Sequence, residues 1–252
     1  DFEDFLIFVE AFAKRDAGEG STPDEGDLSP RMEEINGQIE FVDLPTLRSR
    51  PQDLVVDALG QVWFTEMGTN RIGRLDPRTN TIAEFSLPTP GGEPHSITVG
   101  PQGNIWFSEI GSNRIGRLDP FSDEIREFIV PTPGSRPNRL NFDRKGILWF
   151  AESTGNQIGR LDPRDGSFTE FPLPASRSDP YGVEIDGKGQ IWFALRRFNQ
   201  LGRLDPDTGT IDAFQLAEEE LELGQIALDS KGQIWFSDVR RGRVGVLNSN
   251  TG

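Results

Sequence analysis

The sequence predicts an all-β fold, a five-bladed β-propeller built from four-stranded antiparallel blades. Every Trp of the chain is followed by Phe, and each Trp-Phe pair follows the previous one after 43 residues. A Gly before each pair and a Gly after it recur at the same step. A repeat in the forties with several short strands is typical of β-propellers. The pairs are Trp63-Phe64, Trp106-Phe107, Trp149-Phe150, Trp192-Phe193 and Trp235-Phe236.

Each repeat divides into four expected strands, as its second copy illustrates. Residues 95–100 alternate polar and apolar side chains, and residues 104–108 are rich in β-branched and aromatic residues. A third strand is expected at 114–119 and a fourth at about 124–130. The order within one repeat is therefore four consecutive strands joined by turns.

Two turns recur in register and predict hairpins. The first turn has the pattern Asp-x-x-Gly in three copies, at 143–146, 186–189 and 229–232. The Asp supplies a side-chain hydrogen-bond acceptor at the start of the turn, and the Gly tolerates positive φ. The third turn ends on residue types that enter the left-handed region most easily. These residues are Asn80, Asp123, Gly166, Gly209 and Gly252.

The Trp-Phe pairs are expected in the core rather than in a ligand site. The third strand of each repeat contains a Gly, which weakens a strand unless a large side chain packs over it. We expect the Trp of a neighbouring strand or blade to be that side chain. The five positions are Gly73, Gly116, Gly159, Gly202 and Gly245.

The two ends of the repeat array are expected to close the ring. The C-terminal residues match the third strand and turn of earlier repeats, with no fourth strand after them. Gln38 to Phe41, followed by Leu44-Pro45, reads as a fourth strand with no blade before it. Such a strand would complete the last blade and remove exposed edges. The alternative is a fragment of a longer ring. Phe41 lies one residue out of register with Phe85, which predicts a bulge or an adjusted turn.

The chain is expected to have two parts, residues 1–37 and the propeller at 38–252. Apolar side chains at helical spacing predict an amphipathic helix from Asp1 to about Lys14, and residues 17–30 read as a flexible linker. The helix resembles the one that follows the calcium loop in EF-hand or dockerin-like modules. Because that loop is missing, we expect no calcium site there. The helical stripe consists of Phe2, Phe5, Leu6, Val9 and Phe12.

Composition limits the classes of partner. The formal net charge is −15, of which residues 1–37 carry −8. This charge argues against nucleic acid and against an anionic membrane surface as partners, and its simplest role is to keep the protein soluble. The chain has no Cys, so it has neither disulfides nor thiolate metal sites. No apolar run approaches 18 residues, and the chain as given carries no signal peptide.

Candidate site residues lie where strands reach the central channel. The start of the first strand and the end of the second should emerge on the same face of the propeller. Four carboxylates and the only His would then surround its mouth, an oxygen-rich setting that suits Mg²⁺ or Ca²⁺. Alternatively, the carboxylates cap backbone amides or pair with Arg71, Arg114 and Arg243. The first set is Gln52, His95, Asn138, Tyr181 and Gly224; the second is Glu66, Glu109, Glu152, Leu195 and Asp238.

The repeated pattern P-x-x-I-x-x-x-x-x-G-x-I-W-F-x-E-x-x-x-N-x-I-G-R-L-D-P, clearest at 94–120, resembles the streptogramin B lyase (virginiamycin B lyase) family over residues 38–252. Members linearise a cyclic depsipeptide antibiotic by elimination at its ester. The resemblance implies His95 as the base that takes a proton α to a carbonyl. It implies Glu93 and Glu109 as ligands of the Mg²⁺ that stabilises the enolate. Two features depart from the family: Gln52 stands where a second His is used, and five blades replace seven.

Three functions remain open at this stage. We favour a non-catalytic propeller, extracellular or periplasmic, that binds a small molecule, glycan or protein at the polar mouth. The alternatives are a Mg²⁺-dependent carbon–oxygen lyase centred on His95 and a structural module of a larger secreted assembly. The expected ligand contacts are Gln52, Glu66, Asn138, Arg139, Glu152, Tyr181 and Asp238.

Overall fold

The computed structural model describes residues 41–217 and 221–248. The chain divides into two units, Asp1–Leu44 and Pro45–Gly252. The helix and linker expected within residues 1–37 lie outside the described residues. All described strands belong to the second unit, and no described helix is long and apolar enough to cross a membrane.

The described residues form five antiparallel sheets, which confirms the five-bladed propeller. Blade 1 contains β1 (Pro51–Val56), β2 (Val62–Glu66), β3 (Arg71–Asp76) and β4 (Thr81–Ser86). Blade 2 contains β5 (Pro94–Val99), β6 (Ile105–Glu109), β7 (Arg114–Leu118) and β8 (Ile125–Ile129). Blade 3 contains β9 (Pro137–Phe142), β10 (Leu148–Glu152), β11 (Gln157–Asp162) and β12 (Ser167–Pro172). Blade 4 contains β13 (Pro180–Ile185), β14 (Ile191–Leu195), β15 (Gln200–Leu204) and β16 (Ile211–Gln215). Blade 5 contains β17 (Leu223–Leu228), β18 (Gln233–Asp238) and β19 (Arg243–Asn248).

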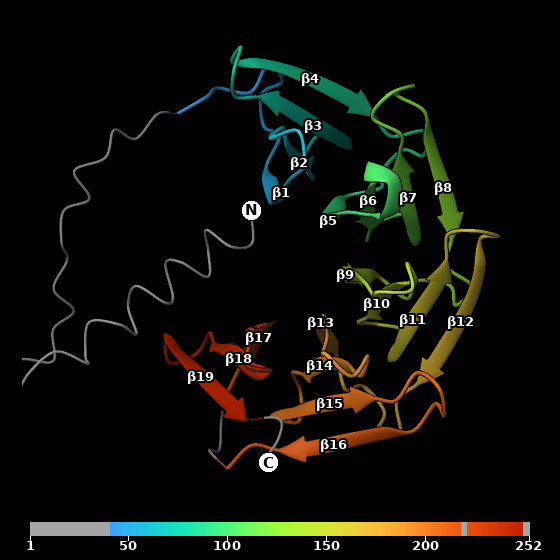
Figure 1. Cartoon of the computed structure of the whole chain (residues 1–252), viewed down its shortest axis with the longest axis vertical. Coiled ribbons are helices and arrows are strands. Elements are labelled where there is room, and N and C mark those ends of the chain that lie inside the picture. Colours follow the sequence, from blue (N-terminus) through green and yellow to red (C-terminus); the bar gives the residue numbers. More distant parts are fainter. Residues whose placement is uncertain (1–40, 218–220, 249–252) are drawn as a thin grey trace, which may run out of the picture. The chain divides into compact units, whose positions relative to one another are not determined.

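The blades of the second unit follow one another along an arc (Figure 1). The inner strands β1, β5, β9, β13 and β17 contact one another in that order, so blades 1 and 5 stand at the two ends. The fifth sheet has three strands within the described residues. Of the strand expected to complete it, Gln38 to Glu40 are not described, and residues 41–44 are in no strand. Closure by that strand stays a prediction.

The turn predictions are confirmed where they can be examined. Asp143 accepts hydrogen bonds from two backbone N–H groups of its turn, and its Oδ2 accepts one from the Trp149 indole at 3.0 Å. Asp57, which lies outside the three copies of the pattern noted in the sequence, makes the same bonds in blade 1. Blade 2 uses a short 3-10 turn, η2 (Pro101–Gly103), instead. The ends of the third turns take positive φ, at Asn80, Asp123, Gly166 and Gly209.

The side chain over the third-strand Gly is Phe, so the expectation of Trp was wrong. A Cβ on Gly116 would lie 2.0 Å from Cε2 of Phe107. These two residues are directly paired between β6 and β7, which puts Phe107 beside Gly116 on one face of the sheet. Trp106 points to the other face because side chains alternate along a strand. There its ring stacks on Phe128 of β8 at 5.6 Å, and Arg117 covers it at 6.0 Å.

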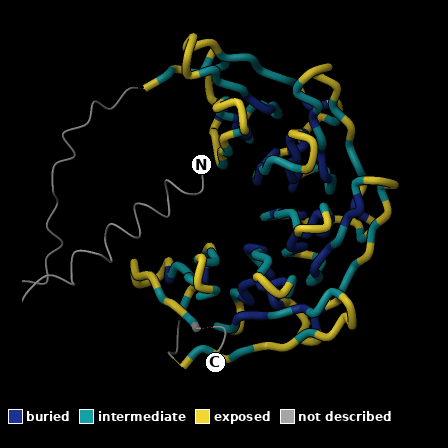
Figure 2. Tube along the Cα trace, viewed as in Figure 1, coloured by how far each residue is buried: buried dark blue, intermediate teal, exposed yellow. Residues whose placement is uncertain are grey.

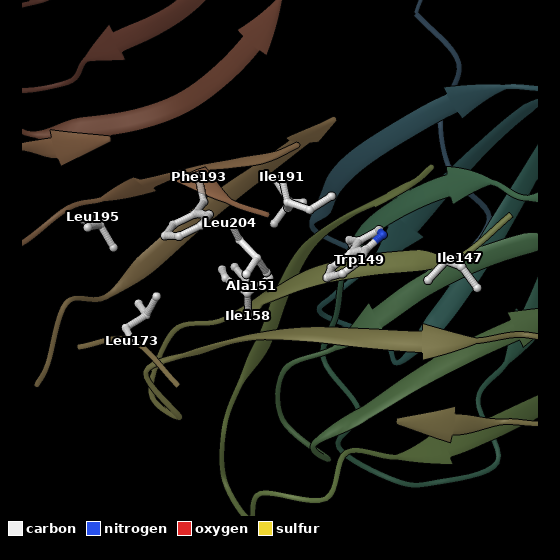
Figure 3. Packing of buried hydrophobic residues seen from close by; sticks show 10 residues of the cluster. Ile147, Trp149, Ala151, Ile158, Leu173, Ile191, Phe193, Leu195 and Leu204 are labelled. Carbon is white, nitrogen blue, oxygen red and sulfur yellow. The ribbon is translucent and has the colours of Figure 1, made fainter. Parts of the chain in front are cut away.

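The core lies in the four junctions between successive blades. At the junction of blades 3 and 4, Trp149, Ile158 and Leu173 meet Phe193, and all four are buried (Figure 3). Val183 of the inner strand β13 belongs to the same buried cluster. Three further clusters repeat this arrangement at the other junctions. Each blade therefore offers its Trp face to the inner strand and Phe of the next blade.

Candidate functional site

The third residue of each inner strand differs from blade to blade, whereas the core positions repeat. A position whose residue type changes from blade to blade is not needed for the repeated packing, so it is a candidate for a functional site. The five residues are Asp53, Ser96, Arg139, Gly182 and Gln225.

Three of these residues meet at one carboxylate. Oδ2 of Asp53 accepts hydrogen bonds from Ser96 Oγ at 3.0 Å, from the Ile97 backbone N–H at 3.1 Å and from Arg139 Nη1 at 2.8 Å. Blade 1 is thereby joined to both blade 2 and blade 3. Sequence analysis named Arg139 but missed Asp53. The sequence did contain a signal: Asp53 is the only acidic residue at its repeat position, and Arg139 occupies the same position two repeats later.

His95 lies beside this ion pair. Its Nδ1 is buried and has no hydrogen-bond partner, and the same holds for Nε of Arg139. Burial, and then the positive charge of Arg139, lower the pKa of His95 below its ordinary value, while Asp53 acts in the opposite direction. The imidazole is therefore neutral at neutral pH and can accept a proton.

This arrangement predicts opposite effects of two substitutions on the pKa of His95. Arg139→Gln should raise it, because a cation that disfavours the imidazolium is removed. Asp53→Asn should lower it further, because the opposing anion is removed. Since the chain has a single His, one imidazole signal in an NMR titration reports both changes. Arg126→Gln, at an exposed ion pair on β8, is the control that should leave the signal unchanged. Shifts of the same sign in both site variants would contradict the arrangement.

The polar network extends to blade 4 through Glu184. Its Oε2 accepts a hydrogen bond from Nδ2 of Asn141 at 3.3 Å. Burial raises the pKa of Glu184 to about 7, with Arg139 opposing that effect. The charge of Arg139 thus lowers the pKa of both His95 on β5 and Glu184 on β13. Glu184 was also missed from the sequence, because its repeat position is occupied by Val, Thr, Asn and Ala in the other blades and so shows no acidic pattern.

Other predicted contacts are tied to their own surroundings. Asn138 accepts a hydrogen bond from the backbone N–H of Arg139 at 2.8 Å, and the exposed Gln52 reaches the carbonyl of Pro51 at 3.5 Å. The Tyr181 ring is covered by the guanidinium of Arg196 at 4.8 Å. These three side chains lie at the starts of β1, β9 and β13, and each contacts a different partner.

The predicted ring of carboxylates is buried inside the blades. Glu66, Glu109 and Glu152 are fully buried, and Asp238 is 2% exposed. Of these four, Asp238 pairs with the Arg five residues later, Arg243, at 3.0 Å. Arg71 and Arg114 instead pair with carboxylates on the fourth strands, Glu84 at 2.9 Å and Glu127 at 3.6 Å.

The residues expected to hold Mg²⁺ differ in their surroundings. Glu93 is exposed, whereas Glu109 is buried, accepts a hydrogen bond from Ser112 at 2.6 Å and leaves Oε1 without a partner. Burial raises the pKa of Glu109 to about 7. An unpartnered carboxylate oxygen is a donor of the kind that Mg²⁺ takes. The same atom is unpartnered in Glu66 and Glu152, so this feature belongs to the repeat. Among the described residues, no three acidic or imidazole groups gather to hold a metal.

Comparison with known proteins places these features in a family. A model described as the virginiamycin B lyase family matches residues 26–252. The chain belongs to the virginiamycin B lyase family. Comparison with curated proteins found no match.

Solved structures of similar sequence agree with the family assignment. Selenomethionine-substituted virginiamycin B lyase from Staphylococcus aureus is 34% identical, with a TM-score of 0.81 over 86% of this chain and 73% of that one. A catalytically inactive His-to-Ala variant of the same lyase with quinupristin is 33% identical, with a TM-score of 0.81 over 87% and 73%. A streptogramin B lyase structure is 33% identical, with a TM-score of 0.76 over 81% and 67%.

Proposed function

We propose that this member of the virginiamycin B lyase family binds a small polar ligand on the channel face of its inner strands, at Asp53, His95 and Arg139. One observation carries the proposal: Nδ1 of His95 and Nε of Arg139 are both buried and both lack a partner. Buried polar atoms without partners cost free energy. A ligand that hydrogen-bonds both atoms would offset that cost.

The residues around His95 and at the expected metal site favour binding without catalysis. Gln52 stands one repeat before it, where the resemblance to the lyases implies a second His. The two carboxylates expected to hold a metal differ, since Glu93 is exposed and Glu109 is buried beneath protein atoms. The ion pair of Asp53 and Arg139 supplies a fixed cation for recognition without any metal. Glycan or protein ligands at the same face stay further possibilities of the same binding function.

Quinupristin, the compound named with the inactive relative, is the probe for this proposal. Isothermal titration should show saturable binding to the wild-type chain, a loss of about tenfold or more in Arg139→Gln, and a smaller loss in His95→Ala, which removes the weaker hydrogen bond to a neutral imidazole. A tenfold loss corresponds to about 1.4 kcal/mol, the size of one hydrogen bond to a charged group. Arg126→Gln is the matched control. Equal binding by Arg139→Gln and the wild type, or no binding by either, would reject the proposed site.

A second function, elimination at an ester, is favoured by the neutral state of His95. Its imidazole would take the proton α to a carbonyl. The electron pair of that C–H bond would form a carbon–carbon double bond as the C–O bond breaks, and the ester oxygen would leave as a carboxylate. Mg²⁺ held by Glu93 and Glu109 would supply Lewis-acid stabilisation of the enolate.

Mass spectrometry after incubation of quinupristin with the protein and Mg²⁺ separates the two functions. Elimination opens the ring without a change in mass, whereas hydrolysis adds one water. A linear product of unchanged mass that disappears in His95→Ala would establish the lyase. Bound but intact quinupristin would support binding alone.

A further inference from the structure

The Trp of blade 2 lacks a hydrogen-bond partner that the Trp residues of the other blades have. In those four blades the indole N–H donates to an Asp carboxylate at 2.9 to 3.1 Å. Blade 2 has Gly100 at the repeat position of the Asp, and within the described residues the Trp106 indole N–H has no acceptor. One carboxylate is therefore missing from an otherwise repeated contact. The four acceptors are Asp57, Asp143, Asp186 and Asp229.

A second donor without a partner lies on the neighbouring strand. Arg117 of β7 is directly paired with Trp106 of β6, and its guanidinium covers the Trp106 ring at 6.0 Å. Nη2 of Arg117 donates to Asn104 at 3.0 Å, whereas its Nε is buried and has no partner. Trp106 is 2% exposed, and unpartnered donors in buried surroundings cost free energy. An ionised carboxylate, which only accepts hydrogen bonds, can satisfy both groups.

Trp106 and Arg117 line a groove of about 390 Å³ between blades 2 and 3. Lys145 and Arg164 line it from blade 3, and no Asp or Glu is among its lining residues. Arg164 is paired with Asp162, which leaves Arg117 and Lys145 to face a ligand. In a chain whose formal net charge is −15, this local excess of positive charge favours an anion.

The groove lies among turns that are open to solvent. Figure 2 shows exposed stretches at the turns of the blades. The turns beside this groove follow the same pattern, since η2 and residues 144–145 are exposed. A ligand can therefore reach the groove from solution.

The corresponding groove between blades 3 and 4 provides an internal comparison. Its volume is about 240 Å³, and Trp149 and Arg160 take the places of Trp106 and Arg117. There the Asp143 carboxylate is among the lining residues and accepts the Trp149 indole N–H at 3.0 Å. The smaller groove thus already contains the carboxylate that the larger one lacks.

We propose that the groove between blades 2 and 3 binds a small ligand through a carboxylate, which accepts hydrogen bonds from the Trp106 indole and the Arg117 guanidinium. Lys145, which is exposed and lies 3.8 Å from Asp207, adds positive charge at its edge. The ligand supplies the acceptor that an Asp side chain supplies in four blades. This site is at the turn after β5, whereas His95 is near the start of that strand, so the inference is independent of the ligand proposed above.

A proton–nitrogen NMR titration of the full chain with succinate, at constant ionic strength, tests the proposal. The five Trp residues give five indole signals. Succinate should shift the Trp106 signal in a saturable way and leave the four indoles that are bonded to Asp in place. A Trp106 signal that does not move, or that moves equally with sodium chloride, would overturn the proposal.

Two variants locate the binding. Arg117→Gln should weaken succinate binding about tenfold or more, because it removes a hydrogen bond to a charged group. The four remaining indole signals show whether that variant stays folded. Lys188→Gln is the matched control, since Lys188 takes the place of Lys145 in the groove whose Trp is already bonded to Asp, and it should bind like the wild type.

Two results of these titrations would count against the site. Equal affinity of Arg117→Gln and the wild type would remove the guanidinium from it. Inorganic phosphate that moves the Trp106 signal at lower concentration than succinate would overturn the choice of a carboxylate as the ligand group.

Discussion

Trp149→Ala should lower the free energy of unfolding by about 3–5 kcal/mol, as expected when a large buried aromatic residue is truncated. The Trp149 side chain is 1% exposed and lies in the junction of blades 3 and 4. Its ring packs against Phe171 at 5.7 Å, and Arg160 covers it at 5.9 Å. Its indole donates to the half-buried Asp143, so truncation also leaves that carboxylate without one of its donors. Urea unfolding followed by circular dichroism measures the loss.

Trp235→Ala is the matched control for this prediction. Trp235 makes the same indole bond, to Asp229 at 3.1 Å, but it is half-buried and has Val246 where the other blades have Arg. With less apolar area to lose, the expected decrease is about 1–2 kcal/mol. Equal losses in the two variants would mean that the end of the array is as well packed as its middle, which would contradict the open fifth blade.

Glu152→Gln should become more stabilising relative to the wild type as the pH rises. Burial, and then the nearby Glu170 carboxylate, raise the pKa of Glu152 to about 8 from an ordinary value of 4.5. The folded protein keeps this proton at pH values where the unfolded chain has lost it. The contribution of Glu152 to stability is thus complete below pH 4.5 and is lost as the pH rises through 8.

The difference in unfolding free energy between Glu152→Gln and the wild type should therefore change by on the order of 3 kcal/mol between about pH 5 and pH 8.5. Urea unfolding at a series of pH values provides the measurement. Glu124→Gln, which changes an exposed Glu in the same way, is the control. Its curve of unfolding free energy against pH should run parallel to that of the wild type. A parallel curve for Glu152→Gln would show that this carboxyl is already ionised and solvated in the folded protein.

Most of the fold could be predicted because it repeats. The 43-residue period fixed the positions of the strands, and local residue types such as Asn80 and Asp123 fixed the turns. The partner of the third-strand Gly was wrong because the sequence shows which residues recur but not which face each uses. Phe107 and Gly116 share a face only because of the strand register between β6 and β7.

The candidate site could be predicted only in part. His95 and Arg139 stand out because they break the repeat, but Asp53 is one of many acidic residues in an acidic chain. Its role depends on a side chain from two repeats away reaching it, which no local pattern encodes. The carboxylates Glu66, Glu109 and Glu152 were expected at an open mouth. Their burial depends on loops that come close to the strand ends: a Cβ on Gly92 would lie 2.8 Å from Oε2 of Glu109, and one on Gly155 would lie 3.0 Å from Oε2 of Glu152.

The bond between Asp53 and Arg139 also changes how the array should unfold. In a repeat protein whose units contact only their immediate neighbours, stability is a sum of terms for single units and adjacent pairs, and the terminal units fray independently. Here the ion pair of Asp53 and Arg139 connects the first blade directly to the third. Loosening of the first blade then exposes a charge that belongs to the third, so this half of the array should open as a single cooperative block while the fifth blade opens alone.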